Sequence, residues 1–598
     1  MKYAYKLLKM FTLIIFMVPG IVYAQAIKDS ILKNYTQEDY EEFVKREMRG
    51  EIPDASGPVP SMRAVNDILV NNNGGATGTG LFTQSETSIL AFGSTVLVGF
   101  NDSGSRDGGA NKFTGWSYST DGGATFMDGG TLPTSTIGDA GDPVFARDES
   151  TGRIYYTTLG FSSPNTIQVF ASDDNGVTWD APVVGTPGGT NEDKQWIAVD
   201  NFAGSGNGNV YLISRRFAGD QGIYVFTSTD NGATFGPDGG VKIVNSTGAG
   251  DNKQGAFIAV GTDHSVYAFW MDDVTNDLNV RKSTDFGATF GATVTFVTGL
   301  AGTQVNNGLN LTGQRQGSAS FSGFRSNSFP HVAVNPVSGH LYLVYNDNPA
   351  GDDKGNIYMV MSDDGAATWS APVQINDDGT TTDQWQPTIA VTPDGNNLGI
   401  FYYSREEDAT DNNLFTYNGR KASISGSIVT FSSSFVISEL QSLPEFGRDN
   451  QVNSTYMGDY NCASATNNIY HVVWSDNRDD LDETGAGNRK DPNVYYKAVP
   501  VGSGSPVAAC QSVSIAADEN CQAMVTAEDV DDGSFHPDGI PVTLSLSPEG
   551  PYELGVTNVT LTVDDGFGGV ATCNATITVN DETAPVAPPA PADVNVEC

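Results

Sequence analysis

Arginine residues follow three apolar segments of the chain, and arginine is well suited to holding an acidic ligand. The planar guanidinium forms two parallel hydrogen bonds with a carboxylate. Arginines that converge from separate segments could therefore bind a ligand carboxylate together. The arginines in this position are Arg216, Arg405 and Arg478.

Carboxyl groups lie near the ends of similar segments, where they could donate or accept a proton. The candidates for this acid–base role are Asp459, Asp476 and Glu406, and Tyr460 directly follows the first of them. Further candidates for ligand contact, each placed before an apolar segment, are Asp193, Lys194 and Trp385. Charged residues are also common in solvated loops, which is the alternative interpretation of all these positions.

Calcium is the one cofactor that the composition suggests, because it prefers hard oxygen ligands. The acidic residues around the candidate site could hold calcium, and so could a late group of aspartates beside glycines. That late group consists of Asp529, Asp531, Asp532 and Asp538. It lacks the spacing of an EF-hand, so an ordinary acidic turn is the competing interpretation. No C-x-x-C or His-rich pattern indicates zinc.

The elements that must position these residues are repeated along the chain. A turn of the form Ser-x-Asp-x-Gly-x-Thr-aromatic occurs five times, and its aspartates are Asp121, Asp174, Asp230, Asp285 and Asp364. The steps between them are 53, 56, 55 and 79 residues, so the last step indicates an insertion. The carboxylate can accept N–H bonds from the turn, and the glycine supplies a positive φ. In the fifth copy, Ala366 replaces that glycine.

A second repeat consists of an apolar strand, a short polar turn and another apolar strand, and it occurs seven times. It predicts an all-β protein, a β-propeller with seven four-stranded blades, with six blades as the second choice. In a propeller the inner strand begins on the face where the second strand ends. The candidate site residues therefore share one face, and the Asp turns lie on the other.

The propeller is expected to span residues 81–500. Residues 504–583 alternate between apolar and polar types, which suggests one Ig-like sandwich. Residues 584–598 form a Pro-rich linker and the start of a further module. Four of the five cysteines lie after residue 500, so disulfides are expected there, although spacing does not determine their pairing.

The N-terminus predicts export from the cell. Basic residues precede an apolar run that ends in Val22-Tyr23-Ala24, which is the pattern of a cleaved signal peptide over residues 1–24. Residues 25–80 are expected to form a surface helix and a linker. No later stretch predicts a membrane span. With 71 acidic against 31 basic residues, the net charge of −40 argues against binding nucleic acid.

The five Asp turns resemble the Asp box, or bacterial neuraminidase repeat, of sialidases and related propellers. Residues 504–583 resemble a hyalin-repeat (HYR) adhesion module, a type that is usually non-catalytic. Sialidases hold the substrate carboxylate with three arginines and use a Tyr–Glu nucleophile pair and an Asp acid/base. No catalytic residue is carried over by motif, and it is the predicted position on one face of the propeller that allows such roles for the three arginines and for Tyr460. The chain departs from that family in lacking Phe-Arg-Ile-Pro and in having seven predicted blades instead of six.

Two functions follow as expectations. The first is a secreted, sialidase-like propeller that recognises glycans and hydrolyses them in the manner of an exo-glycosidase. The second is a non-catalytic extracellular protein that binds a glycan or glycoprotein and carries adhesion-type modules. Neither the sugar nor the oligomeric state follows from the sequence.

Overall fold

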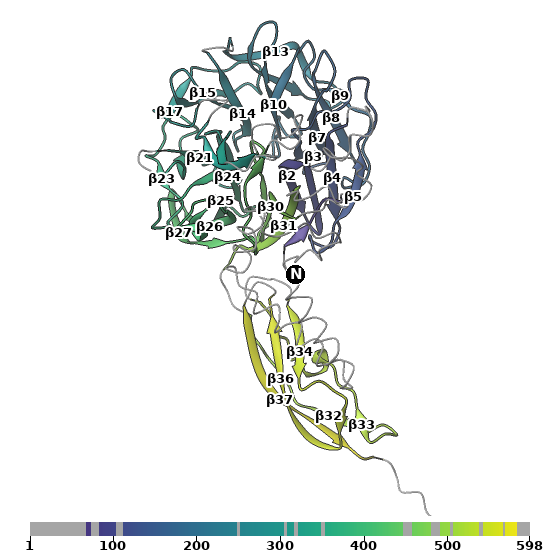
Figure 1. The fold of residues 1–598 in the computed structure, drawn as a ribbon. Coiled ribbons are helices and arrows are strands. Elements are labelled where there is room, and N and C mark those ends of the chain that lie inside the picture. Colours follow the sequence, from purple (N-terminus) through teal and green to yellow (C-terminus); the bar gives the residue numbers. More distant parts are fainter. Residues whose placement is uncertain are drawn as a thin grey trace, which may run out of the picture.

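A computed structural model describes residues 67–72, 83–102, 112–247, 251–303, 308–315, 321–348, 353–446, 457–479, 491–502, 506–536, 542–565 and 569–582. The described residues form seven four-stranded antiparallel sheets arranged around a common centre, as Figure 1 shows. The all-β propeller is thereby confirmed, with seven blades. The predicted signal peptide, the predicted N-terminal helix, Asp538 and the tail after residue 582 lie outside the described residues.

Each blade runs from the centre of the ring outward, and six blades follow the chain in simple order. They are β2–β5 (Gln84–Phe92, Thr95–Asp102, Thr114–Ser119, Met127–Thr131) and β6–β9 (Val144–Arg147, Ile154–Leu159, Ile167–Ser172, Val183–Val184). Next come β10–β13 (Glu192–Val199, Val210–Arg216, Gly222–Ser228, Gly236–Asn245) and β14–β17 (Lys253–Val260, Val266–Asp272, Asp277–Ser283, Val294–Thr298). They end with β20–β23 (His331–Val334, Leu341–Asp347, Asn356–Ser362, Val373–Gln374) and β24–β27 (Gln384–Val391, Asn397–Ser404, Thr416–Ser425, Ile428–Val436).

The seventh blade closes the ring with a strand from the beginning of the chain. Its first three strands are β29 (Ala463–Ala465), β30 (Ile469–Asp479) and β31 (Asp491–Pro500), and its outermost strand is β1 (Ile68–Leu69). Ile68 pairs with Tyr496 and Leu69 with Tyr495. The segment expected to be a linker therefore contributes a strand, and this closure removes a free sheet edge.

The Asp turns join the third and fourth strands of five blades and have the hydrogen bonds expected of them. In the turn at Asp230, Thr234 donates its N–H to Oδ1 (2.9 Å) and its hydroxyl to Oδ2 (2.6 Å). The Ser228 hydroxyl donates to the same carboxylate at 2.7 Å. Gly232 has φ +74°, and Ala366 adopts φ +69° at the equivalent position of the fifth copy. Ala366 therefore holds a left-handed conformation that disfavours a Cβ atom.

The long step before the fifth turn corresponds to an additional small sheet. Strands β18 (Leu311–Arg315) and β19 (Phe321–Phe324) form a hairpin, and β28 (Glu445–Phe446), from between the sixth and seventh blades, pairs with β18 in parallel. The Phe324 ring contacts those of Trp385 and Phe446, with centroids 5.9 Å apart in both cases. This packing fixes the additional sheet on the sixth blade.

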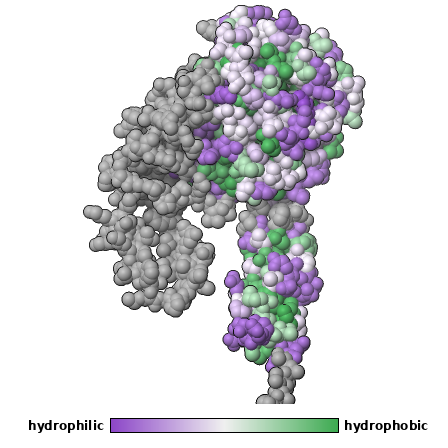
Figure 2. Space-filling view, turned by 90° about the vertical axis from the view of Figure 1, so that its right-hand side faces the viewer, coloured by the Kyte–Doolittle hydropathy of each residue, from purple (hydrophilic) through white to green (hydrophobic). Residues whose placement is uncertain are grey.

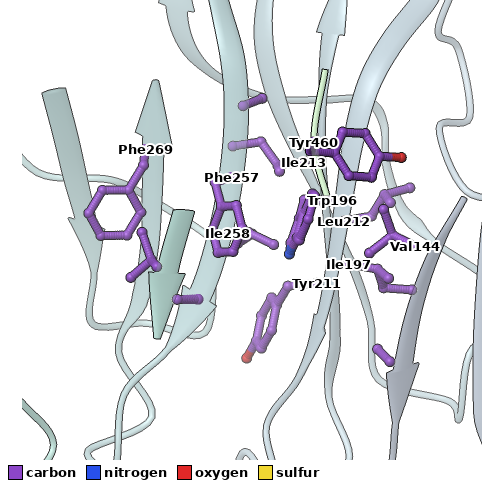
Figure 3. Close-up of a cluster of buried hydrophobic side chains, with 14 of the residues drawn as sticks. Val144, Trp196, Ile197, Tyr211, Leu212, Ile213, Phe257, Ile258, Phe269 and Tyr460 are labelled. Atoms are coloured by element: carbon purple, nitrogen blue, oxygen red, sulfur yellow. The ribbon is translucent and has the colours of Figure 1, made fainter. Parts of the chain in front are cut away.

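The core of the ring is built from the inner and second strands. Figure 3 shows Trp196 between Phe257 and Tyr460, with Ile197, Ile213 and Val144 nearby. The Trp196 and Phe257 rings stack with centroids 4.3 Å apart, and Tyr460 meets Trp196 edge-on at 5.5 Å. These rings come from three different blades, so aromatic packing joins the blades at the centre.

The C-terminal residues form a separate unit outside the ring (Figure 1). A four-stranded sheet in the order β32-β37-β36-β34 lies with the two-stranded sheet β33-β35 and the short helix α4 over one apolar core. Their bounds are β32 Val513–Ala516, β33 Gln522–Ala523, α4 Ala527–Val530, β34 Thr543–Ser547, β35 Tyr552–Glu553, β36 Gly555–Asp564 and β37 Val570–Asn580. Figure 2 shows apolar patches on this unit beside hydrophilic ones. Its Ig-like and HYR character stays a prediction.

Two of the late cysteines form a disulfide, as expected for this part of the chain. Cys510 is joined to Cys573, with their Cα atoms 6.1 Å apart. In the described part of the chain, Cys462 and Cys521 are free thiols, the first buried and the second exposed. Among the helices described, none has the length and apolar character to cross a bilayer.

Candidate functional site

The candidate site lies where the inner strands begin, on the face opposite the Asp turns. Four residues there have positive φ although none is glycine: Glu86 (+54°), Asp142 (+56°), Lys194 (+46°) and Gln386 (+49°). Such conformations cost about 1–3 kcal/mol each and concentrate at ligand-binding and active sites. In three of these blades the inner strand, β2, β10 or β24, has a β-bulge at this point. The bulge interrupts the regular alternation of side chains between the two faces of the sheet.

Six charged side chains converge here, and we call them the mouth cluster. They come from the first, second, third and seventh blades and from the segment after β19. The members are Glu86, Asp142, Asp193, Lys194, Arg325 and Asp459. Four acids against two bases give the cluster an excess of negative charge when all are ionised.

Glu86 and Asp142 form a carboxyl pair across the first two blades. The two side chains are hydrogen-bonded to each other. Asn101 holds both residues, because its Nδ2 donates to Glu86 Oε2 (2.7 Å) and its Oδ1 accepts the N–H of Asp142 (2.7 Å). Glu86 Oε1 also accepts the N–H of Asp459 at 3.0 Å. Glu86 is buried, whereas Asp142 is half-buried and so reaches the surface of the site.

Arg325 and Asp459 form the outer part of the mouth cluster. The guanidinium makes two hydrogen bonds with the carboxylate, from Nε to Oδ1 (3.1 Å) and from NH2 to Oδ2 (2.6 Å). Their side chains are 19% and 12% exposed, so this pair is open to solvent at its edge. Asp193 lies nearby and accepts a hydrogen bond from Gln254 Nε2 at 3.1 Å.

Lys194 is a buried ammonium in an aromatic surround. Its Nζ lies 4.2 Å from the ring centroid of Tyr460, 4.8 Å from that of Trp196 and 5.8 Å from that of Phe329. The residue is 4% exposed, and among the described residues no hydrogen bond or ion pair joins its ammonium to an acceptor. A buried charge without an acceptor is costly, so a ligand oxygen that supplied one would be bound favourably.

Burial and mutual repulsion raise the pKa of three acids of the mouth cluster, Glu86, Asp142 and Asp193. Burial first, and then the negative charge of Glu86, raise the pKa of Asp142 well above its usual range. Burial also raises the pKa of Glu86 and of Asp193, in each case with a contribution from the charge of Asp459. Burial lowers the pKa of Lys194, although the neighbouring carboxylates oppose this. Carboxyls that hold a proton towards neutral pH are suited to acid catalysis.

The structure brings four of the predicted site residues together: Asp193, Lys194, Asp459 and Tyr460. The Tyr460 hydroxyl donates to the carbonyl of Pro143 at 3.2 Å. Burial raises the pKa of Tyr460 well above its usual value, and the charges of Asp142 and Glu86 add to this. The phenol is therefore held in its protonated form, which is the opposite of what a nucleophile requires.

The three predicted arginines do not meet, because each is buried against carboxylates of its own protein. Arg216 Nε pairs with Glu192 at 2.5 Å, and Arg405 NH1 pairs with Asp383 at 2.8 Å. Arg478 NH1 and NH2 each lie 2.6 Å from a carboxylate, the first from Asp67 and the second from Asp476. These guanidiniums hold strand ends together, and Arg478 fixes the segment that closes the ring. Their predicted convergence on a ligand carboxylate is not what the structure shows.

Three further predicted residues also lie away from the mouth cluster. Asp476 is engaged by Arg478. Trp385 is fully buried, and the Arg405 guanidinium lies 5.2 Å from its ring centroid. Glu406 begins the 3-10 helix η2 (Glu406–Asp408), where burial and the charge of Asp378 raise its pKa to about 7.

Two of the predicted calcium ligands of the C-terminal unit, Asp529 and Asp531, have structural roles. Asp529 accepts the N–H of Thr526 at 2.9 Å as part of a capping box of α4. Asp531 accepts the N–H groups of Gly533 (3.2 Å) and Ser534 (3.0 Å), and the Asp532 N–H donates to Ala509. Within the ranges described, no group of three or more His, Cys, Asp or Glu side chains is arranged to hold a metal ion.

Sequence reasoning did not select Glu86 or Arg325, and it treated Asp142 only as one of many loop carboxylates. Glu86 lies in the bulge of β2, between Ser85 and Ser88, and nothing in the local sequence indicates a left-handed conformation there. Arg325 belongs to the inserted segment, outside both repeats. Asp142 precedes its strand as Asp193 and Asp459 do, so this shared position was the available signal.

No protein-family model and no curated protein sequence matches this chain. Among solved structures, the chain is similar to an α-L-arabinofuranosidase of Fusarium graminearum (12% identity, TM-score 0.37), covering 74% of this chain and 99% of that one. It is also similar to an intramolecular trans-sialidase of Ruminococcus gnavus (15% identity, TM-score 0.36), covering 73% of this chain and 98% of that one. A third similar structure is an ulvan lyase (11% identity, TM-score 0.42), covering 73% of this chain and 94% of that one. At these scores no residue role is transferred from them.

Proposed function

We propose that this protein is a secreted glycan-active propeller that binds a sugar at the mouth cluster and hydrolyses a glycosidic bond there. The observation that carries the proposal is the convergence of four carboxyl groups and two cations on the face where the inner strands begin. The positive φ of Glu86, Asp142 and Lys194 supports it, since strained backbone is concentrated at functional sites.

The chemistry of the cluster fits a polyhydroxylated ligand. Ionised carboxylates accept hydrogen bonds from sugar hydroxyls, and the unpartnered ammonium of Lys194 can donate to a sugar oxygen. The Lys194 Nζ lies over the rings of Trp196 and Tyr460, 4.8 and 4.2 Å from their centroids, and Figure 3 shows these two rings within the packed centre of the ring. A glycan would therefore enter from one face and place one end of its chain at the mouth cluster, because the filled centre prevents it from passing through the ring.

A non-catalytic, glycan-binding protein of the cell surface or matrix is the second candidate. This candidate is favoured because the three arginines expected to hold a substrate carboxylate, Arg216, Arg405 and Arg478, are already paired with carboxylates of the protein itself. In that case the mouth cluster would bind a sugar without cleaving it.

The test combines a panel of fluorogenic glycosides, sialosides included, with a glycan array. We expect release of the fluorophore from at least one glycoside by the wild-type protein and loss of release in Lys194→Met. The matched control is Lys282→Met, because Lys282 pairs with Asp263 at 3.3 Å on the face of the Asp turns. Binding on the array without turnover would support the second candidate, and neither binding nor turnover would refute both.

A further inference from the structure

We infer that Asp142 is the catalytic acid of this site and that Glu86 is the positioning residue that keeps a proton on it. The inference rests on the proposed hydrolysis, but the proton-sharing pair is itself open to an independent test. Neither residue was selected from the sequence, and the pair joins two adjacent blades.

The hydrogen bonds around the two carboxyl groups assign them different protonation states. Glu86 accepts hydrogen bonds from Asn101 Nδ2 and from the N–H of Asp459, so its two oxygens face donors and favour the ionised form. Asp142 receives no comparable set of donors, and its side-chain hydrogen bond with Glu86 favours its protonated form. Asp142 is therefore the O–H donor of the pair and Glu86 the acceptor.

The position of Asp142 suits a proton donor. The Asp142 residue is only partly buried, whereas Glu86 is 1% exposed, so Asp142 is the member of the pair that lies nearer the surface. Asn101 fixes its backbone, and the side chain of Gln195 holds its carbonyl. A Cβ atom on neighbouring Gly141 would collide with the Asn101 amide, so this glycine (φ +90°) permits the close approach.

Other charged groups face the pair and set the electrostatics of the proton. On β10, Asp193 opposes ionisation of Asp142 and Lys194 favours it. From the seventh blade, Asp459 opposes ionisation of Glu86, and Arg325 from the inserted segment favours it. Tyr460 and Cys462 also lie nearby, but burial raises the pKa of each, to about 12 for Cys462, so both stay neutral.

A second observation indicates that this cluster meets a ligand. Lys194 is more than nine-tenths buried, feels the charges of Asp142, Asp459 and Glu86, and yet has no hydrogen-bond acceptor among the described residues. Gln254 similarly directs one amide hydrogen to Asp193 while its buried Oε1 has no donor. A sugar with several hydroxyl groups would supply both.

In the step that we infer, the Asp142 carboxyl transfers its proton to the glycosidic oxygen. The bond from the anomeric carbon to that oxygen breaks, and both electrons stay on the oxygen, which leaves as an alcohol. The oxygen of a water molecule forms the new bond to the anomeric carbon. That water gives its proton to an ionised carboxylate of the mouth cluster, and exchange with solvent restores the proton of Asp142.

The first experiment measures the pH dependence of kcat/KM with two aryl glycosides, one with a poor leaving group and one with a good one. Asp142→Asn should lower kcat/KM about 100- to 10,000-fold for the poor leaving group and far less for the good one. Glu86→Gln removes the negative charge that holds the proton, so the basic limb should move to lower pH. Asp148→Asn is the control, because Asp148 is a fully buried aspartate in a turn on the opposite face.

The second experiment does not depend on turnover. The infrared C=O stretch of protonated carboxyls at neutral pH should be weaker in Asp142→Asn than in the wild-type protein and unchanged in Asp148→Asn, because the contribution of Glu406, whose pKa is about 7, is common to all three. An unchanged leaving-group dependence in Asp142→Asn, or an unchanged band in that variant, would overturn the inference. If the band weakens in Asp142→Asn but the wild type cleaves no glycoside, the proposed function fails while the proton-sharing pair stands.

Discussion

Closure of the ring depends on a very short strand, and substitution of Asp67 tests how it is held. β1 contributes two paired residues, and Asp67 directly precedes them. The fully buried Asp67 carboxylate accepts hydrogen bonds from Arg478 NH1 (2.6 Å) and from the N–H of Glu439 (2.8 Å). Lys497 Nζ lies 3.4 Å from its other oxygen. We predict that Asp67→Asn opens the seventh blade.

The size of the expected loss of stability follows from the burial of the Asp67–Arg478 ion pair. Removing one partner of a buried ion pair costs about 3–5 kcal/mol, because the other charge is left without compensation. Arg478 keeps its hydrogen bonds to Asp476, so we expect the lower end, about 3 kcal/mol. The population in which the blade is open should then rise about 100-fold.

Urea unfolding followed by tryptophan fluorescence measures this loss, since Trp474 lies in the same blade, 5.8 Å from the Arg478 guanidinium. Limited proteolysis should show faster cleavage near the N-terminus. Asp173→Asn is the control, because Asp173 pairs with Arg153 at the surface and is 67% exposed. An unchanged urea midpoint in Asp67→Asn would refute the reasoning.

Further predictions concern packing, turns and pH. Trp196→Ala should destabilise the ring by about 3–5 kcal/mol in urea unfolding, because it removes the stacked ring between three blades. Ala366→Gly should raise the thermal midpoint, by about 1 kcal/mol of stability, since glycine adopts φ +69° without strain. Asp230→Ala should cost about 1–3 kcal/mol and leave glycoside turnover unchanged, because its turn lies on the face opposite the mouth cluster. The pKa of Glu406 is raised to about 7, so ionisation in the folded state weakens stability as the pH rises from its ordinary value through 7. Glu406→Gln should therefore raise the thermal midpoint at mildly alkaline pH and change it little at acidic pH.

Some of the candidate site residues could be placed from the sequence, and others could not, because their partners are distant in the chain. Asp193, Lys194, Asp459 and Tyr460 precede or begin inner strands, and a propeller brings all such positions to one face. Their convergence was therefore predictable. The partners of the three arginines were not, because an arginine at a strand end gives no sign of which carboxylate it will meet. Arg478, for example, pairs with Asp67, 411 positions earlier.

The sequence by itself determined the repeating parts of this protein. The Asp turns close within four residues through Ser, Asp and Thr hydrogen bonds, and strand alternation is equally local, so five turns and seven strand pairs were enough to predict the ring. Tertiary structure alone decided which charges are neutralised within the fold and which converge in the mouth cluster. Arg325 reaches Asp459 across 134 positions, and Glu86 meets Asp142 from the neighbouring blade. The physical reason is that the protonation and pairing of a buried charge depend on its whole surroundings, which the ring assembles from distant segments.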